Sequence, residues 1–185
     1  MNLPTNSTAV LTLDFQKGIF DLVQGSEACV ANAALVVDAA RKKGYKIIHV
    51  GIGFENGLPE VPATGSRFSS MKEKNMFAKG TLSAEFAPSL RKDGDLVIYK
   101  QRVSAFSENT LDMVLRTQGI KNLVLMGIVT SGIVLSTLRR AADLDYICVV
   151  IKDACFDRDE EVHRVLTEKV FTSQATVITT KDFLA

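Results

Sequence analysis

Two titratable side chains of opposite charge follow apolar runs that lie far apart in the sequence. Asp14 follows the run "TAVLTL" (residues 8–13), and Lys100 ends the run "DLVIYK" (residues 95–100). If both runs are parallel strands of one sheet, both side chains lie at its carboxyl edge, where open α/β sheets bind ligands. A carboxyl group and an ammonium group in one pocket can act as a proton donor or acceptor with an electrostatic partner, or form a purely structural ion pair.

Further candidates for contact with a small ligand occupy the same edge or the segments next to it. Gln16, Thr130 and Ser131 follow predicted strands, as does Asp153, a weaker candidate. Phenylalanines could form apolar walls and an arginine could bind a carboxylate, although core packing is the simpler explanation for each phenylalanine and solvent exposure for each arginine. These candidates are Phe20, Phe54, Phe68 and Phe106 for the walls, and Arg67 or Arg102 for the carboxylate.

Apolar runs alternate with helical patterns along the chain. The runs cover residues 8–13, 46–54, 95–100, 122–128, 147–154 and 175–180, and the helical patterns cover 28–45, 107–119, 131–146 and 159–171. Ser107 is the expected N-cap of the second helical pattern and Gly119 its stop. The order predicts an α/β fold, a Rossmann-like three-layer α/β/α arrangement with a mostly parallel sheet of about six strands. We expect one domain over residues 1–185, with the irregular residues 55–93 above the site.

Composition narrows the class of function. The 185 residues carry a net charge of +1, with Lys and Arg scattered along the chain, which argues against nucleic acid or a membrane surface as a partner. No apolar run is long enough for a bilayer, and the start shows no secretory pattern. Three cysteines and two histidines form no recognisable metal motif. We expect a cytoplasmic protein with no metal or other cofactor and a small-molecule substrate.

Five segments in order carry a resemblance to a known family. "AVLTLDFQKGI", "GTLSAEFAPSL", "VIYKQRVSAF", "NLVLMGIVTSGIVLST" and "DLDYICVVIKDAC" together resemble the isochorismatase-like hydrolases, which include isochorismatases, nicotinamidases and N-carbamoyl amidases. The resemblance runs from about residue 8 to about residue 180. It implies a hydrolase that forms a homo-oligomer, a dimer or higher.

The resemblance also assigns roles to individual residues. It implies that Asp14 and Lys100 are catalytic and that the peptide bond between Ile128 and Val129 is cis. It further implies an anion-binding pocket formed by the backbone N–H groups of Val129 and Ile133. Amidase members carry their nucleophilic cysteine at the position of Ile133, and an isoleucine cannot attack a carbonyl.

Substitutes for the missing thiol are few. Ser131 and Ser136 lie near Ile133, but neither has a histidine close in sequence to activate it, and Cys155 follows the fifth strand. Nicotinamidase-like members hold a metal with an Asp-x-His pair after the second strand, where this chain reads "VGIGFEN". His49 lies within that strand and is expected to point into the packing.

Three hypotheses remain open at this point. The first is a thiol-independent hydrolase that acts on a small carboxylated metabolite, with Asp14 protonating an isochorismate-like vinyl ether. The second is a catalytically degenerate homologue that keeps the pocket and only binds a small ligand. The third is an amidohydrolase that uses Ser131 or Cys155 as its nucleophile.

Overall fold

The computed structural model of the protein describes residues 3–185 and confirms the predicted α/β class. One sheet of six parallel strands has the order β3-β2-β1-β4-β5-β6. The strands are β1 (Thr8–Leu13), β2 (Lys46–Ile52), β3 (Leu96–Lys100), β4 (Asn122–Ile128), β5 (Ile147–Phe156) and β6 (Ala175–Ile178). The chain reverses its direction of winding between β1 and β4, which is where a doubly wound sheet opens a crevice for a ligand.

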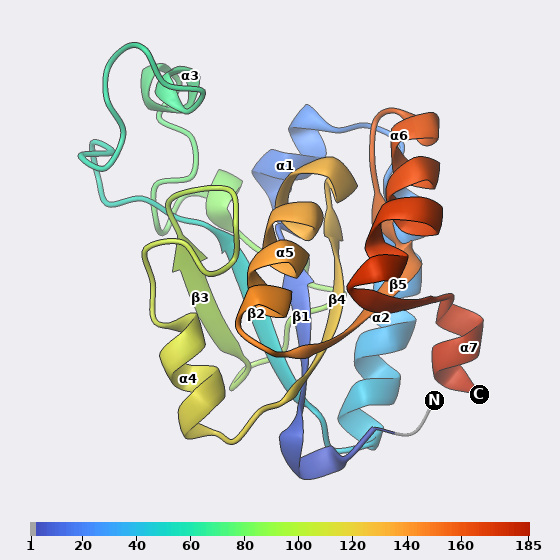
Figure 1. Cartoon of the computed structure of the whole chain (residues 1–185). Coiled ribbons are helices and arrows are strands. Elements are labelled where there is room, and N and C mark those ends of the chain that lie inside the picture. The colour runs from blue at the N-terminus through green and yellow to red at the C-terminus, as the bar shows by residue number, and fades with distance from the viewer. Residues whose placement is uncertain (1–2) are drawn as a thin grey trace.

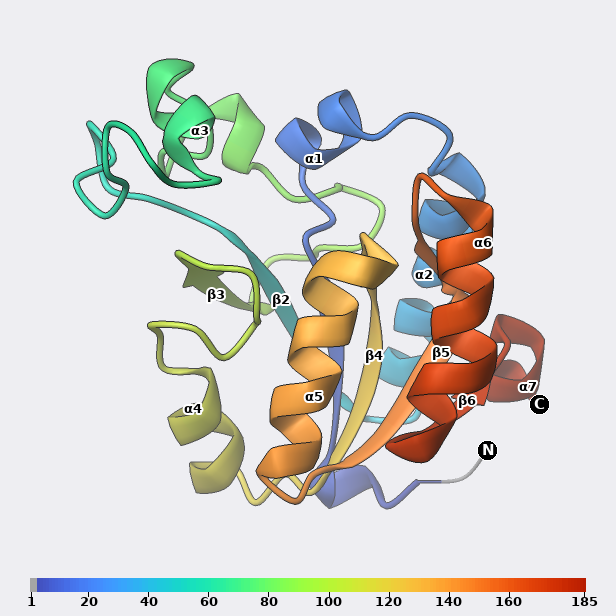
Figure 2. The same ribbon diagram turned by 45° about the horizontal axis from the view of Figure 1, so that its top comes forward.

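Helices cover both faces of this sheet (Figures 1 and 2). Helices α2 and α7 lie on one face, and α4, α5 and α6 lie on the other. The helices are α1 (Lys17–Leu22), α2 (Glu27–Lys42), α3 (Ser69–Glu73), α4 (Leu111–Thr117), α5 (Leu135–Asp143), α6 (Glu160–Val165) and α7 (Thr180–Leu184). Across residues 3–185, none of these helices has both the length and the apolar character that crossing a bilayer requires.

Irregular helical turns extend two of these helices. A π-helical turn over Thr130–Val134 precedes α5, and another over Leu166–Val170 continues α6 into a 3-10 turn at Phe171–Ser173. Two further 3-10 turns span Thr5–Ser7 and Leu82–Ala84. The turn before α5 matters most, because it joins the end of β4 to the helix at the ligand-binding edge.

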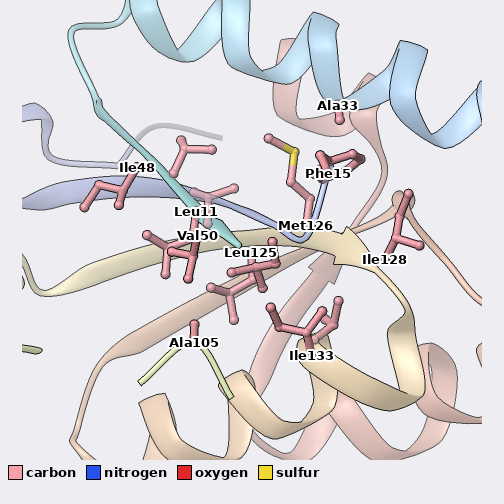
Figure 3. Close-up of a cluster of buried hydrophobic side chains, with 14 of the residues drawn as sticks. Leu11, Phe15, Ala33, Ile48, Val50, Ala105, Leu125, Met126, Ile128 and Ile133 are labelled. Carbon is pink, nitrogen blue, oxygen red and sulfur yellow. The ribbon is translucent and has the colours of Figure 1, made fainter. Parts of the chain in front are cut away.

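The sheet forms the centre of the core because both of its faces are covered. All residues of β1 and β4 are buried, which explains why these strands are continuously apolar and do not alternate with polar residues. Figure 3 shows Leu11, Val50 and Leu125 packed within one cluster, with Ala33 of α2 on one side of the sheet and Ile133 on the other. Ile133 therefore belongs to the core as well as to the turn that precedes α5.

The segment between β2 and β3 is a long excursion, as the sequence predicted. It carries α3 and lies beside α1 at the carboxyl edge of the sheet (Figures 1 and 2). Isolated bridges join Gln16 to Phe86 and Phe54 to Ala78, so the excursion is tied to the segments that follow β1 and β2. These ties hold it above the sheet edge in place of a regular helix.

Several predicted boundaries are wrong for identifiable reasons. Ser107 is not the N-cap of α4, because Glu108 adopts φ 54°, which a right-handed helix does not allow, and the helix begins after Thr110. The last strand stops at Ile178, because Thr179 forms a capping box with Asp182 and starts α7. Helices α1, α3 and α7 are short, and the sequence analysis missed all three.

The fifth strand is longer than predicted and passes through an irregularity. Leu125 of β4 pairs with Val150 of β5, whereas Gly127 pairs with Cys155, so β5 advances five residues while β4 advances two. The extra residues bulge out of the ladder, and the strand then rejoins β4 at its carboxyl end. The bulge returns the chain to the edge where Asp14 and Lys100 lie.

Gly127 tests the close contact between β1 and β4. A Cβ atom added there would meet the Cβ and carbonyl oxygen of Leu13 at 2.6 Å. We expect Gly127→Ala to lower the free energy of unfolding by about 1–3 kcal/mol in urea denaturation, because the strand backbone cannot move aside. Gly132→Ala is the control, since its Cβ would meet only a methyl group of Val129 at 3.0 Å. Equal stability of the two variants would contradict this account.

Candidate active site

Asp14 and Lys100 meet at the carboxyl edge of the sheet. Asp14 directly follows β1 and Lys100 ends β3, and β2 lies between these strands. The Nζ atom of Lys100 lies 3.0 Å from Oδ2 of Asp14 and 3.1 Å from the carbonyl oxygen of Arg102. Both side chains are almost completely buried, with 5% of Asp14 and 1% of Lys100 exposed. The fold thus removes two opposite charges from water and holds them in contact.

Burial changes the proton affinity of both groups. Desolvation raises the pKa of Asp14 to about 6, and the nearby ammonium of Lys100 opposes part of that increase. Desolvation lowers the pKa of Lys100, and the carboxylate of Asp14 opposes that decrease. Within the described residues, Oδ1 of Asp14 is buried and has no hydrogen-bond partner. Lys100 thus contacts one carboxyl oxygen of Asp14, and the other oxygen keeps its capacity to bind a proton.

A cavity of about 280 Å³ opens at this pair. Its charged and polar lining combines the Asp14–Lys100 pair with groups from the excursion and from the loops after β4 and β5. These polar lining residues are Asp14, Lys100, Arg67, Ser131, Asp157 and Arg158. The remaining wall is mainly aliphatic or aromatic, so the cavity suits a small molecule that has both an apolar part and charged or polar groups.

The turn after β4 forms one wall of the cavity. The peptide bond between Ile128 and Val129 is cis, and both residues line the cavity together with Ile133. The side chain of Ile133 is buried, so the position to which the family resemblance assigns the nucleophile is an aliphatic part of the core. The backbone N–H of Ser131 donates to Oδ2 of Asp157 at 2.7 Å.

The structure brings some of the predicted ligand contacts to this cavity. Arg67, Phe68 and Ser131 line it. The guanidinium of Arg67 lies over the ring of Phe68, with 5.6 Å between its central carbon and the ring centroid. Arg67 itself is exposed, and its charge reaches Lys100, where it contributes to the lowered pKa. An exposed arginine at the mouth of an apolar cavity can bind the carboxylate of a ligand.

Gln16 and Thr130 are not in contact with the cavity, contrary to the sequence analysis. Gln16 is fully buried, donates to the carbonyl oxygens of Ile52 and Ala84, and accepts from the backbone N–H of Ile52. It therefore ties the excursion to β2. Thr130 is also fully buried, and its hydroxyl lies 2.8 Å from Nδ1 of His163.

Three aromatic candidates lie elsewhere. Phe54 is fully buried in the core, and Phe20 lines a neighbouring hollow between α1 and α2. Phe106 stacks on Tyr146 with a centroid distance of 6.0 Å. An apolar side chain at the sheet edge can pack into the core or line a ligand pocket. The residue type alone therefore could not show which phenylalanines line the cavity.

Arg102 does not line the cavity itself but lies beside it. Its guanidinium donates to the carbonyl oxygens of Gln101 and Glu60, and its central carbon lies 5.5 Å from the ring centroid of Phe68, which lines the cavity. Asp153 lies in the bulge of β5, and its Oδ1 accepts from the N–H and the hydroxyl of Thr180 at 2.7 and 2.9 Å. Asp153 therefore holds α7 in place and does not line the cavity.

The sequence analysis missed several groups of the lining. Asp157 and Arg158 follow β5 directly, and the rule that ligands bind after parallel strands would have found them if that strand had been predicted to run to Phe156. The apolar residues missed are Ile19, Leu22 and Val23 near α1, Ile52 of β2, Met71 of α3 and Val103. Nothing in their spacing distinguishes these apolar residues from ordinary core positions.

The three cysteines are buried and none lines the cavity. Burial raises the pKa of Cys155 and of Cys148 to about 12 and also raises that of Cys29. Because the thiolate is the nucleophilic form, these cysteines are poorly suited to attack a carbonyl. Ser131 does line the cavity, but the nearest described imidazole, that of His163, contacts Thr130 instead.

His49 is part of a buried hydrogen-bond network. Its Nδ1 lies 2.6 Å from the hydroxyl of Thr12, and its Nε2 lies 3.1 Å from Oδ2 of Asp95, which also pairs with Arg41. Burial lowers the pKa of His49, which favours the neutral ring. In the part of the chain that the structure describes, no group of three or more His, Cys, Asp or Glu side chains is placed to hold a metal ion.

Comparisons with known proteins agree with this fold. The model of the isochorismatase domain matches residues 8–182. The ureidoacrylate amidohydrolase RutB of Rhizobium rhizogenes is 32% identical over 214 residues, which cover 100% of this chain and 85% of RutB. The protein YwoC of Bacillus subtilis, an isochorismatase family protein, is 32% identical over 185 residues, covering 100% of this chain and 96% of YwoC. The structure of an isochorismatase family protein from Burkholderia thailandensis has a TM-score of 0.83 at 26% identity, covering 100% and 97% of the two chains.

The cysteines provide a test of this site. At neutral pH we expect none of the three to react quickly with a chromogenic disulfide reagent in the native protein, because a pKa near 12 leaves roughly a thousandfold less thiolate than an ordinary thiol. All three should react after denaturation. Ile133→Cys should add one reactive thiol in the native state, since it lies on the cavity wall. Rapid modification of native Cys155 would contradict the assignment of that residue to the core.

Proposed function

Because the chain belongs to the isochorismatase family and is one of its hydrolases, we propose that it hydrolyses a vinyl ether in a small carboxylated metabolite. One observation carries this proposal. Asp14 is a buried acid with a pKa near 6 and an unpartnered oxygen at the cavity, while the nucleophile position holds Ile133. A site with an acid and no nucleophile suits a reaction that begins with proton transfer.

The proposed reaction begins at Oδ1 of Asp14. The ammonium of Lys100 lies against Oδ2, so the proton of the neutral carboxyl group resides on Oδ1. Transfer of that proton to the terminal carbon of the vinyl ether leaves an oxocarbenium ion and an Asp14 carboxylate, which Lys100 stabilises. Water then adds to the cationic carbon, and the resulting hemiketal breaks down to a ketone and an alcohol.

The cavity suits such a substrate. Its volume of about 280 Å³ limits the substrate to a small molecule. Burial raises the pKa of Asp14 to about 6, so a larger fraction of the protein carries the transferable proton near neutral pH than with an exposed carboxyl group. Arg67 at the rim supplies a positive charge for the substrate carboxylate, and the ring of Phe68 holds its guanidinium at the mouth.

Amide hydrolysis is the second candidate function, and the relatives named ureidoacrylate amidohydrolase favour it. It needs a nucleophile in the cavity. Ser131 is the residue in position, since Cys155 is buried outside the lining. An amidase would form a covalent intermediate on Ser131 or Cys155, visible as a mass shift of the intact protein after mixing with an amide substrate.

The third possibility is a homologue that binds a small ligand without converting it. Such a protein keeps the cavity for recognition, and the Asp14–Lys100 pair then serves stability alone. It would bind isochorismate-like ligands tightly and release no product. Neither the wild-type protein nor Lys100→Ala would convert the ligand, so this substitution would leave the cellular function unchanged.

The central test replaces the acid. With isochorismate as the substrate, Asp14→Asn should lower kcat by about 10²–10⁴-fold, because the amide cannot donate the proton. Thiol alkylation of the wild-type protein should leave kcat unchanged. Asp153→Asn is the control, because Asp153 bonds Thr180 away from the cavity. Wild-type protein that binds isochorismate without releasing product would refute the proposed reaction.

The pH profile provides an independent test. Asp14 must be protonated to act, so kcat/KM should be highest below its pKa of about 6 and fall about tenfold per pH unit above it. The direction follows from burial, which holds the proton on Asp14 to a higher pH than an exposed carboxyl group would. A rate that rises through this range would instead indicate that the carboxylate acts as a base.

A further inference from the structure

We propose that Asp157 is a second catalytic carboxylate, which takes a proton from the water that adds to the substrate. This inference rests on the proposed vinyl-ether hydrolysis and goes beyond it, because it assigns the step after proton transfer. Asp157 lines the same cavity as Asp14 and comes from the opposite side of β4. Inverting glycosidases use two carboxyl groups in this way: one donates a proton, and the other activates a water that attacks an oxocarbenium-like carbon.

The sheet register sets the spacing between the two carboxyl groups. Leu13 of β1 pairs with Gly127 of β4, and Gly127 pairs with Cys155 of β5. Asp14 comes one residue after Leu13, and Asp157 comes two residues after Cys155. The two aspartates therefore lie on either side of the turn that follows β4. Neighbouring strands lie about 4.8 Å apart, which separates the two backbones by about 10 Å. Both residues line one cavity of about 280 Å³, in which a small substrate and a water molecule would bind.

The two carboxyl groups have different surroundings. Asp14 lies against Lys100 and is deeply buried, with Oδ1 unpartnered. Asp157 is half-buried, and its two oxygens accept the backbone N–H groups of Ser131 and Arg158 at 2.7 and 2.9 Å. A carboxylate has about four lone-pair sites, so each oxygen of Asp157 keeps capacity to accept from a water. Environments that differ in this way divide acid and base roles between two carboxyl groups.

Arg158 does not neutralise Asp157 through its side chain. Its guanidinium donates to the carbonyl oxygen of Leu22, at the end of α1, at 2.9 Å. This contact joins the loop after β5 to α1 across the cavity and fixes the backbone on which Asp157 lies. The carboxylate is thus held by backbone N–H groups on a loop with a fixed position, as a group that receives a proton should be.

The sign of the charge also favours this role. Amide hydrolysis builds an oxyanion, which N–H donors stabilise, whereas vinyl-ether hydrolysis builds a cation. In this cavity the N–H of Ser131, which would otherwise be available to an oxyanion, already donates to the carboxylate of Asp157. The carboxylate of Asp157 destabilises an oxyanion nearby and stabilises an oxocarbenium ion.

The steps balance without any further reactant. Proton transfer from Asp14 forms a C–H bond and leaves the oxocarbenium ion and the Asp14 carboxylate. Water adds to the cationic carbon as Asp157 takes one of its protons, which gives a neutral hemiketal. The C–O bond to the leaving group then breaks as Asp157 returns its proton to the departing oxygen. The remaining hydroxyl proton goes to Asp14, which restores both groups and releases a ketone and an alcohol.

The test separates proton transfer from the structural hydrogen bond. Asp157→Asn keeps an oxygen that can accept from Ser131, turns its amide NH2 towards the N–H of Arg158 and cannot take a proton, so we expect kcat for isochorismate to fall at least about 10²-fold, with KM little changed and Tm only slightly lowered. Asp159→Asn is the matched control, because Asp159 caps α6 by accepting the N–H groups of Glu161 and Val162 at an exposed site. Its kcat should equal that of the wild type.

Chemical rescue gives a readout that a structural role would not affect. In Asp157→Ser, a short side chain still accepts from the turn and leaves space for a small acid, so added formate should restore part of kcat. Wild-type kcat in Asp157→Asn would overturn the assignment, as would loss of activity in both Asp157 variants without rescue by formate. Absence of turnover in the wild-type protein would instead refute the vinyl-ether reaction itself, so the two failures are distinguishable.

Discussion

The contact between Asp14 and Lys100 is the constraint on which the site depends. Two charged groups lose their hydration here, and their mutual attraction offsets only part of that cost. Removing one partner from such a pair commonly destabilises a protein by about 3–5 kcal/mol, because the other charge stays buried and unpaired. The same desolvation raises the pKa of Asp14 to about 6, so this residue holds its proton to a higher pH than an exposed carboxyl group. Stability and chemistry therefore depend on the same burial.

Much of the surrounding structure serves to maintain that burial. The excursion between β2 and β3 covers the sheet edge, and Gln16 ties it down through Ile52 and Ala84. Helix α1 closes another side, held by Arg158 at Leu22. None of these contacts involves a substrate in the proposed reaction, yet without them water would reach the ion pair and return Asp14 towards an ordinary carboxyl group.

The turn after β4 shows how a family fold can accommodate different chemistry. The backbone follows β4 through a cis peptide into a wide helical turn, and the side chain at its apex, Ile133, packs into the core. An aliphatic group there removes the nucleophile and keeps the cavity wall dry. In the reaction proposed above, Asp14 supplies the acid and Asp157 the base on either side of this turn.

The sequence by itself determined the α/β class, the six strands and the positions of Asp14, Lys100 and Ile133. Continuous apolar runs and the residues that follow them are local patterns, and parallel strands bring their carboxyl ends to one edge whatever the loops do. Only the tertiary structure decided which loop residues reach that edge. Phe54 and Gln16 turn into the interior, whereas Asp157 reaches the cavity because a bulge in β5 shifts the register by three residues. Bulges and loop contacts depend on packing between distant segments, which no local pattern records.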